Sequence, residues 1–262
     1  MDYLLFRLYG PLASWGEIAV GATRHTASYP SKSAIVGLMA AALGIKRSDT
    51  EGQHQMQQGY AIAVEVYAQG SLLRDYHTTQ VPDSVGKIRY RTRRDELVLG
   101  KERIQATNGT ILSTREYRSD ALALVAVRAL TNAPYDLQIV KNDLNKPKFH
   151  LYLGRKSCPL AAPLHPQIVS RQNYFEAFKA YRHKQLLPVH TNDTEGLSNR
   201  DVYWLQLGKQ RHYYWEGEPD DFSDEVELER MQTRTRHDQP LSRARWQFSP
   251  RQEHYLFLAG GE

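Results

Sequence analysis

Apolar residues alternate with polar ones, or run together, at several places in the first 155 residues. Leu4, Phe6 and Leu8 occupy every second position near the N-terminus, which is the spacing of a strand with one buried face. A second alternating segment follows, and later a continuous apolar run that is typical of a strand buried on both faces. The predicted strands cover residues 3–9, 60–67, 72–77, 121–127 and 149–153.

Helical patterns lie between these strands, over residues 33–43, 48–58 and 134–144. Ser31 or Ser33 is expected to cap the first helix and Gly44 to end it, and a capping box from Ser48 to Glu51 predicts the start of the second. The order strand–helix–strand, then strand–helix–strand, favours an α+β fold that is ferredoxin-like or RRM-like. We expect this domain to cover residues 1–155.

Residues 81–118 differ from the rest of this domain because they carry many charges and few large apolar side chains. Asn108-Gly109 separates the β-prone segments 103–107 and 110–114, and Asn-Gly in that position is a strong hairpin signal. The sequence therefore predicts a protruding β-hairpin inserted in the domain at about 81–118.

The chain beyond residue 155 has weaker periodicity and is expected to form a smaller, β-rich C-terminal region over 156–262. A short helix is predicted at 174–181, and strands are predicted at 202–207 and 255–258. Residues 216–229 hold eight acidic residues and no basic one, which predicts a solvated acidic loop.

Composition excludes several classes of protein. The single cysteine, Cys158, cannot form an internal disulfide or a cysteine-rich metal site, and the ten histidines lack metal-binding spacing. No apolar run reaches the length of a membrane span, and the N-terminus lacks the layout of a signal peptide. We therefore expect a cytoplasmic protein with no cofactor, no metal and no membrane contact.

The formal net charge of +5 is concentrated in one segment. Residues 87–118 hold nine basic and four acidic residues, and Tyr90 and Tyr117 lie among them. Basic and aromatic side chains on a projecting hairpin suit single-stranded nucleic acid. A solvated or protein-binding hairpin is the alternative.

Two smaller motifs also suggest chemistry. Ser31, Lys32 and Ser33 lie at the start of the first helix, where backbone N–H groups favour a phosphate, although plain helix capping is the alternative. His77, at the end of a predicted strand, has the chemistry of a general acid or base. Because no partner for it is identifiable in the sequence, a hydrogen-bonding or packing role is favoured.

Several separated strings together resemble the CasD family, the subunit of the type I-E CRISPR Cascade complex that binds the 5′ handle of the crRNA. They include GPLASWG, TASYPSKSAIVGL, RDYHT and YLGRKSCPL. The matching positions are residues 10–16, 26–38, 43–45, 74–78, 115–117 with 120–121, and 152–160, and more loosely 236–240 and 251–257. The resemblance covers residues 3–160 well and fades over 165–230.

This resemblance implies an RRM-like body with a β-hairpin thumb that reaches the backbone subunit CasC. The implied partners are the crRNA 5′ handle, CasC and the large subunit CasA, with target DNA met only through the assembled complex. The implied role is non-catalytic, and it caps the crRNA filament next to the large subunit. The alternative is the role of a related branch in type I-C systems, a metal-independent endoribonuclease that cleaves CRISPR repeat RNA. His77 and Tyr76 would then be the catalytic residues.

The resemblance also places contacts on particular residues. The expected RNA-binding residues are Arg24, Ser31, Lys32, Ser33, Arg74, Tyr76, His77, Arg115, Tyr117, Arg155 and Lys156. The expected contacts of the thumb with RNA or a neighbouring subunit are Arg89, Arg91, Arg93, Arg94, Lys101 and Arg103. For Arg155 and Lys156 a turn packed on the sheet edge remains the alternative.

Overall fold

The computed structural model describes residues 1–19, 21–80, 82, 89–102, 104, 110–186, 196–224, 230–242, 245 and 247–259. Its main sheet has seven strands in the order β10-β11-β9-β4-β7-β1-β8, and all of their described pairs are antiparallel. These strands are β1 (Asp2–Tyr9), β4 (Tyr60–Ala68), β7 (Leu122–Ala129), β8 (Gln167–Ser170), β9 (Arg211–Trp215), β10 (Gln232–Ser242) and β11 (Gln247–Leu258). The sheet thus combines strands from both sides of residue 155.

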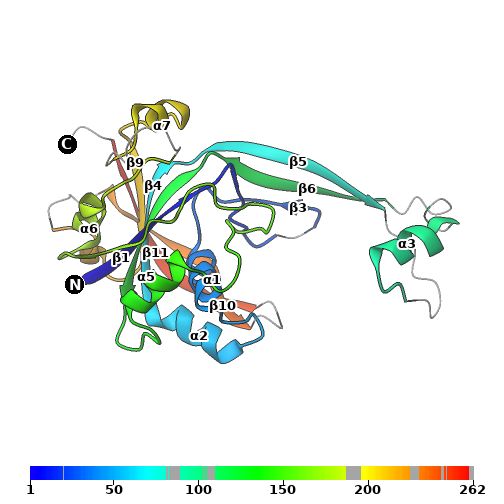
Figure 1. Cartoon of the computed structure of the whole chain (residues 1–262). Coiled ribbons are helices and arrows are strands. Elements are labelled where there is room, and N and C mark those ends of the chain that lie inside the picture. Colours follow the sequence, from blue (N-terminus) through cyan, green and yellow to red (C-terminus); the bar gives the residue numbers. More distant parts are fainter. Residues whose placement is uncertain are drawn as a thin grey trace.

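A second sheet contains β2 (Leu12–Ala13), β3 (Thr23–Arg24), β5 (Ser71–Gln80) and β6 (Thr110–Ser119). The helices are α1 (Lys32–Leu43), α2 (Thr50–Gly59), α3 (Arg93–Leu99), α5 (Leu137–Asn145), α6 (Tyr174–Ala180) and α7 (Asn199–Trp204). The chain is therefore a mixed α+β protein (Figure 1). Among the residues that the structure describes, no helix has the length and apolar character needed to span a membrane.

Both faces of the main sheet are covered, which explains why β1 is buried at almost every position. Leu4, Phe6 and Leu8 pack on one face with the apolar sides of α1 and α5. Tyr3 and Leu5 point to the other face, where they pack with residues of α6. Successive side chains of a strand alternate between faces, so the predicted alternation in residues 3–9 is confirmed.

Local signals at the ends of α1 act as predicted. The Ser31 hydroxyl accepts a hydrogen bond from the backbone N–H of Ala34 at 3.3 Å, and Gly44 ends the helix in the left-handed conformation with φ of 77°. At α2 the predicted cap is shifted by one residue, because Asp49 rather than Ser48 accepts the N–H of Gly52, at 2.9 Å. The capping residues thus fix where each helix begins.

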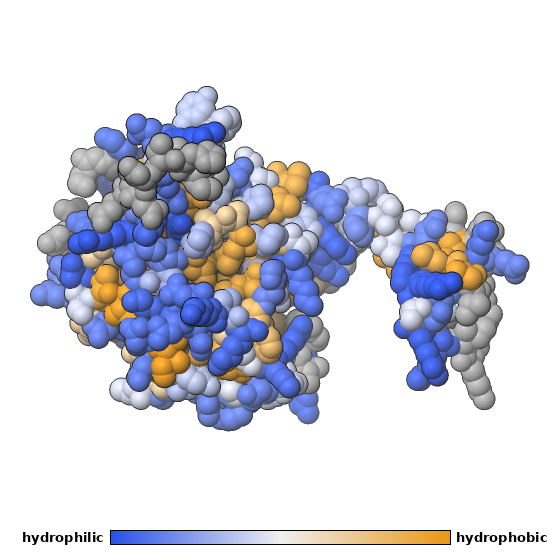
Figure 2. Space-filling view, viewed as in Figure 1, coloured by the Kyte–Doolittle hydropathy of each residue, from blue (hydrophilic) through white to orange (hydrophobic). Residues whose placement is uncertain are grey.

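The strands β5 and β6 form a long two-stranded ribbon that projects from the body of the molecule (Figure 1). Ten residue pairs hold it together, from Ser71 with Ser119 at its base to Gln80 with Thr110 at its far end. The helix α3 lies beyond the far end, and Figure 2 shows this tip separated from the body by a narrow neck. β2 and β3 pair with β6 close to the body.

The predicted pairing of 103–107 with 110–114 is not seen in the part of the chain that the structure describes, which within 103–107 includes only Ile104. Residues 110–114 pair with 76–80 of β5, and residues 101, 102 and 104 are helical. A capping box between Thr92 and Asp95 stabilises the start of α3, which ends before Gly100. Asn108-Gly109 lies outside the described residues.

Two other predicted strands are absent from the described structure. Residues 149–153 form only an isolated bridge at Tyr152, because the N–H groups of Lys148 and Phe149 donate to the last carbonyls of α1, at 2.9 and 3.1 Å. Residues 202–207 belong to α7 and the turn after it. There, Ser198 and Asp201 form a capping box whose two hydrogen bonds measure 3.1 and 3.0 Å.

The acidic run is only partly solvated over residues 216–224, the part that the structure describes. The Glu216 side chain is 12 % exposed and accepts the N–H of Ile62 in the main sheet at 3.2 Å. Asp221 forms a two-pronged ion pair with Arg128, and Phe222 is fully buried. The prediction of a solvated loop is therefore wrong for Glu216 and Asp221, which neutralise basic groups on the body, whereas the other described acids of the run, Glu218, Asp220 and Asp224, are exposed.

The loop that contains Gly154 approaches the loop after β2 closely. Gly154 has φ of 84°, and a Cβ at this position would overlap the carbonyl oxygen of Ser14. We expect Gly154→Ala to lower the free energy of unfolding by about 2 kcal/mol or more, through strain in φ and this overlap. Gly21→Ala is the matched control, since Gly21 has φ of 83° with nothing near its Cβ position, and we expect a loss of about 1 kcal/mol. Urea denaturation measures both, and equal losses would contradict the overlap.

Candidate nucleic-acid interface

A groove of about 1650 Å³ runs along one side of α1. One wall comes from residues 14–24, which include β3, and from residues 149–156. The opposite wall comes from residues 235–240 of β10 and Phe248 of β11. The groove therefore lies between the N-terminal and C-terminal parts of the chain, with the start of α1 on its lining.

Four of the sequence-predicted RNA-binding residues line this groove together, namely Arg24, Ser31, Ser33 and Lys156. The hydroxyls of Ser31 and Ser33 lie 3.0 Å apart at the N-terminus of α1, where backbone N–H groups and the helix dipole favour an anion. The guanidinium of Arg24 donates to the carbonyls of Gly21 and Thr23. The groove thus places the Arg24 guanidinium and the N-terminus of α1 on one lining, where both favour a phosphate.

Lys156 adds an exposed ammonium to the same wall. Among the described residues, no carboxylate forms an ion pair with Lys156 or with Arg24. Both cations can therefore meet a phosphate without first breaking a salt bridge.

Lys32 does not face the groove. Its ammonium is 2.9 Å from Glu216, and its side chain is 10 % exposed. Glu216 also lies 3.2 Å from Arg251, whose side chain is 7 % exposed. Lys32 thus belongs to a buried charge network that joins α1 to the C-terminal strands, and the structure does not bring it together with Ser31 and Ser33 as a ligand group.

The C-terminal wall was not predicted as part of a site. Arg236 on β10 forms an ion pair with Glu17 in the N-terminal wall, at 3.2 Å, and Asp238 pairs with the buried Arg251 at 2.6 Å. In the sequence, residues 236–240 belong only to the looser part of the resemblance, and nothing local indicates which segment they face. The pairing of Arg236 with Glu17 links the two walls of the groove.

The ribbon separates residues that the sequence prediction grouped. Arg74 and Tyr76 lie on one face, together with Glu116, whereas His77 lies on the other face with Arg115 and Tyr117. Tyr76 is 65 % exposed, and His77 is 3.8 Å from the carboxylate of Asp75. Tyr76 and His77 therefore do not form a joint catalytic pair.

Tyr117 is buried at the base of the ribbon, so it does not offer an open face to a base. The guanidinium of Arg155 lies over its ring, 5.0 Å from the centroid. Arg155 is half-buried there, in keeping with the packing alternative, whereas its neighbour Lys156 is exposed and lines the groove. Arg115 is half-buried on β6, where it pairs in register with Asp75 on β5 and with Arg24 on β3.

Most of the predicted thumb cations lie at the tip of the ribbon. Arg89, Arg91, Arg94 and Lys101 are exposed, and Arg93 forms an ion pair with Glu96 at 2.6 Å. Arg103 lies outside the described residues. The tip also exposes two apolar side chains of α3, Leu97 at 46 % and Val98 at 63 %.

Glu116 ties the ribbon to the N-terminal wall of the groove. Its buried carboxylate accepts the Arg74 Nε–H at 3.1 Å and the Thr26 backbone N–H at 3.4 Å, and His25 Nδ1 lies 3.2 Å from it. Burial acts to raise the pKa of Glu116, but the hydrogen bonds from His25, Thr26 and Arg74 outweigh it and lower the pKa. The ionised carboxylate is therefore the form that the fold stabilises.

This lowered pKa predicts a pH-dependent effect on stability. Stabilisation by Glu116 is present above the pKa of an unfolded glutamate, about 4.3, and is lost as pH falls through the lower folded value. We expect Glu116→Gln to reduce the urea midpoint at pH 7, with the difference from the parent shrinking below about pH 4. Glu102→Gln, at an exposed position of the tip, is the control. A difference that stays constant from pH 7 to pH 3 would contradict the assignment.

Comparison with known proteins identifies the family of this chain. The family model of CRISPR-associated protein (Cas_Cas5) matches residues 3–253. A relative from Escherichia coli (strain K12), "CRISPR system Cascade subunit CasD", is 33 % identical over 176 residues, which cover 62 % of this chain and 69 % of the relative.

Two solved structures share the fold. A chain of a "CRISPR RNA-guided surveillance complex" superposes with a TM-score of 0.62 at 22 % identity, over 98 % of this chain and 90 % of that one. The chain of a "Crystal structure of Cas protein" does so with a TM-score of 0.53 at 24 % identity, over 98 % and 95 %. Since the family model spans nearly the whole chain, this protein belongs to the Cas5 family of CRISPR-associated proteins.

Proposed function

We propose that this chain is a subunit of a Cascade-type CRISPR complex and that it holds the 5′ handle of the crRNA in the groove beside α1. The observation that carries this proposal is the convergence of the α1 N-terminus with Arg24 and Lys156, the cations of the groove described above as lacking a carboxylate partner. Phosphate contacts to such groups supply most of the affinity for a nucleic-acid backbone. Family membership and the name of the Escherichia coli relative support the same role.

The strand order supports the ferredoxin-like reading of the body. β8-β1-β7-β4 is a row of antiparallel strands, with α1 between β1 and β4 in the chain and α5 between β7 and β8. This is the connection of a split βαβ unit. The ribbon β5–β6 would then be a long excursion of the connection between β4 and β7, which corresponds to the thumb.

The same geometry favours a non-catalytic role over RNA cleavage. Tyr76 and His77 point to opposite faces of the ribbon, and neither lines the groove. An acid–base pair must reach the same reacting atoms. The chain is therefore proposed to bind the RNA and leave it intact.

Binding of the handle is tested with the full chain and a single-stranded RNA of the handle sequence. We expect Arg24→Ala with Lys156→Ala to weaken binding about tenfold or more and to reduce the slope of log affinity against log salt by about 1.4, since two phosphate contacts are lost. The matched control is Arg171→Ala with Lys209→Ala, which removes the same charge from exposed positions outside the groove. Equal weakening by both double variants would show nonspecific attraction and contradict the groove assignment. Accumulation of cleaved RNA in the parent reaction would overturn the non-catalytic role.

The tip of the ribbon is proposed to dock on a neighbouring protein subunit through Leu97 and Val98, with the surrounding arginines nearby. We expect Leu97→Asp with Val98→Asp to reduce incorporation into a reconstituted complex about tenfold or more, because buried apolar contacts at an interface are lost. Binding of handle RNA by the isolated chain should not change. Ile139→Asp, at an apolar position of α5 that is 44 % exposed, is the control. Normal incorporation of the tip variant would refute docking through this surface.

A further inference from the structure

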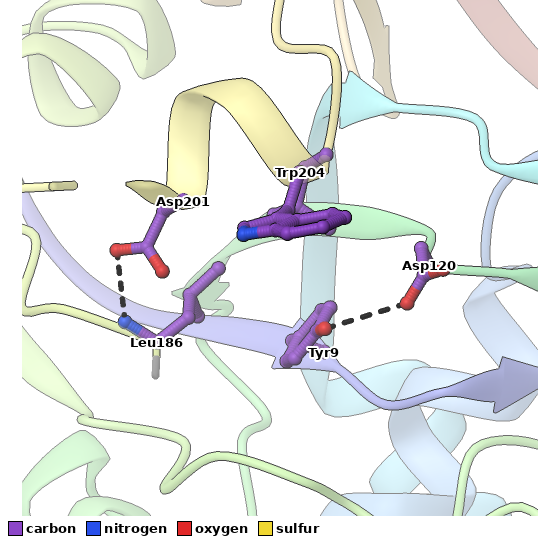
Figure 3. A pocket seen from close by; sticks show the side chains of 6 residues that line it. Tyr9, Asp120, Leu186, Asp201 and Trp204 are labelled. Atoms are coloured by element: carbon purple, nitrogen blue, oxygen red, sulfur yellow. Dashed lines mark hydrogen bonds between the residues drawn. The ribbon is translucent and has the colours of Figure 1, made fainter. Parts of the chain in front are cut away.

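A second cavity of about 150 Å³ lies between the body and α7, away from the groove (Figure 3). Its lining consists of Tyr9, Asp120, Leu186, Asp201, Trp204 and Leu205. None of these residues lines the groove, so an inference about this cavity does not rest on RNA binding. Figure 3 shows the ring of Trp204 above Tyr9, with Asp120 to one side and Asp201 and Leu186 to the other.

The two charged side chains of this lining are both carboxylates. Asp201 is fully buried and accepts the N–H groups of Ser198 and Leu186, at 3.0 and 3.2 Å, so it serves the cap of α7. Asp120 is exposed, and its carboxylate accepts the Tyr9 hydroxyl at 3.4 Å. The Asp120 backbone has a positive φ of 57°, which fixes this side chain at the junction of β6 and β7.

Aromatic surface adjoins the same opening. Trp204 is 62 % exposed, and its ring lies 5.4 Å from that of Tyr203, which is 75 % exposed. Exposed tryptophan and tyrosine beside a pocket are typical of the residues that dominate protein–protein interfaces. An indole next to a carboxylate also favours a cation, because the ring face and the acid both attract positive charge.

We propose that this cavity receives an arginine side chain presented by a protein partner. A cavity of this size holds a group as large as benzene, and a guanidinium is smaller. A planar guanidinium can stack on Trp204 while it donates to the Asp120 carboxylate. The two carboxylates repel phosphates, so the lining disfavours a nucleotide.

The test uses the full chain, titrated with N-acetyl-arginine amide and followed by tryptophan fluorescence. We expect a saturable change in tryptophan fluorescence, with a dissociation constant in the millimolar range. The change should be absent in Trp204→Phe, which identifies Trp204 as the reporter among the four tryptophans. N-acetyl-citrulline amide, the neutral analogue of nearly the same shape, should bind at least about fivefold more weakly because the charge interactions are lost. N-acetyl-lysine amide should also bind more weakly, because it cannot stack as a plane.

Asp120→Asn is the decisive variant. Asparagine tolerates a positive φ and keeps an acceptor for Tyr9, so the fold is retained while the charge is removed. We expect it to weaken binding of the arginine probe about fivefold or more, whereas Asp224→Asn, at an exposed position outside the cavity, should have no effect. Equal binding of the citrulline probe, tighter binding of a nucleoside monophosphate, or an unchanged affinity in Asp120→Asn would each overturn the proposal.

Discussion

The buried guanidinium of Arg251 is the centre of an ionic network that joins the start of α1 to the C-terminal strands. Glu216, Asp238 and Glu253 surround it at 3.2, 2.6 and 2.6 Å, and Glu216 is shared with Lys32 at the start of α1. Burial acts to lower the pKa of Arg251, but the three carboxylates raise it above its ordinary value. Charges taken out of water are costly unless they are paired, so each acid in this network is needed by its neighbours. β9, β10 and β11 are thereby fixed against the helix that lines the groove.

The network also determines which basic side chains of the groove remain available to a phosphate. Lys32 and Arg251 are neutralised internally, and Arg236 is held by Glu17 across the groove. Arg24 on β3 and Lys156 also line the groove, and neither forms an ion pair with a carboxylate of the described residues. The positive character of the groove therefore comes from a few residues whose neighbours leave them unneutralised, and the net charge of +5 alone says little about it.

The parts of the fold that the sequence predicted are those set by short-range patterns. The alternation of Leu4, Phe6 and Leu8, and the cap and stop at Ser31 and Gly44, act within one element and were recovered. The strand partner of β6 was not predicted, because pairing with β5 brings together residues that are already 30 positions apart at the far end of the ribbon. α7 was mistaken for a strand because its apolar residues outweighed the capping signal of Ser198 and Asp201.

The predictions for the candidate site also failed where they depended on residues distant in the sequence or on the faces of a strand. Arg24, Ser31, Ser33 and Lys156, four of the residues that the resemblance names, line the same groove. Lys32 was predicted to belong with them but does not line the groove, because it pairs with Glu216. Glu216 comes from a distant acidic run whose local sequence predicts a solvated loop. Arg74 and His77 were expected to act together, but they are three positions apart in a strand and therefore face opposite ways.

The ribbon joins two strands that are neighbours in the main sheet, β4 and β7, so its length is independent of the register of that sheet. Each residue added to both strands would move the tip outward by about 3.4 Å. An addition of two residues to each strand keeps every side chain beyond it on the same face, whereas an addition of one exchanges the faces. The reach of this protein toward a neighbour can thus vary among relatives in steps of about 7 Å without any change in the body.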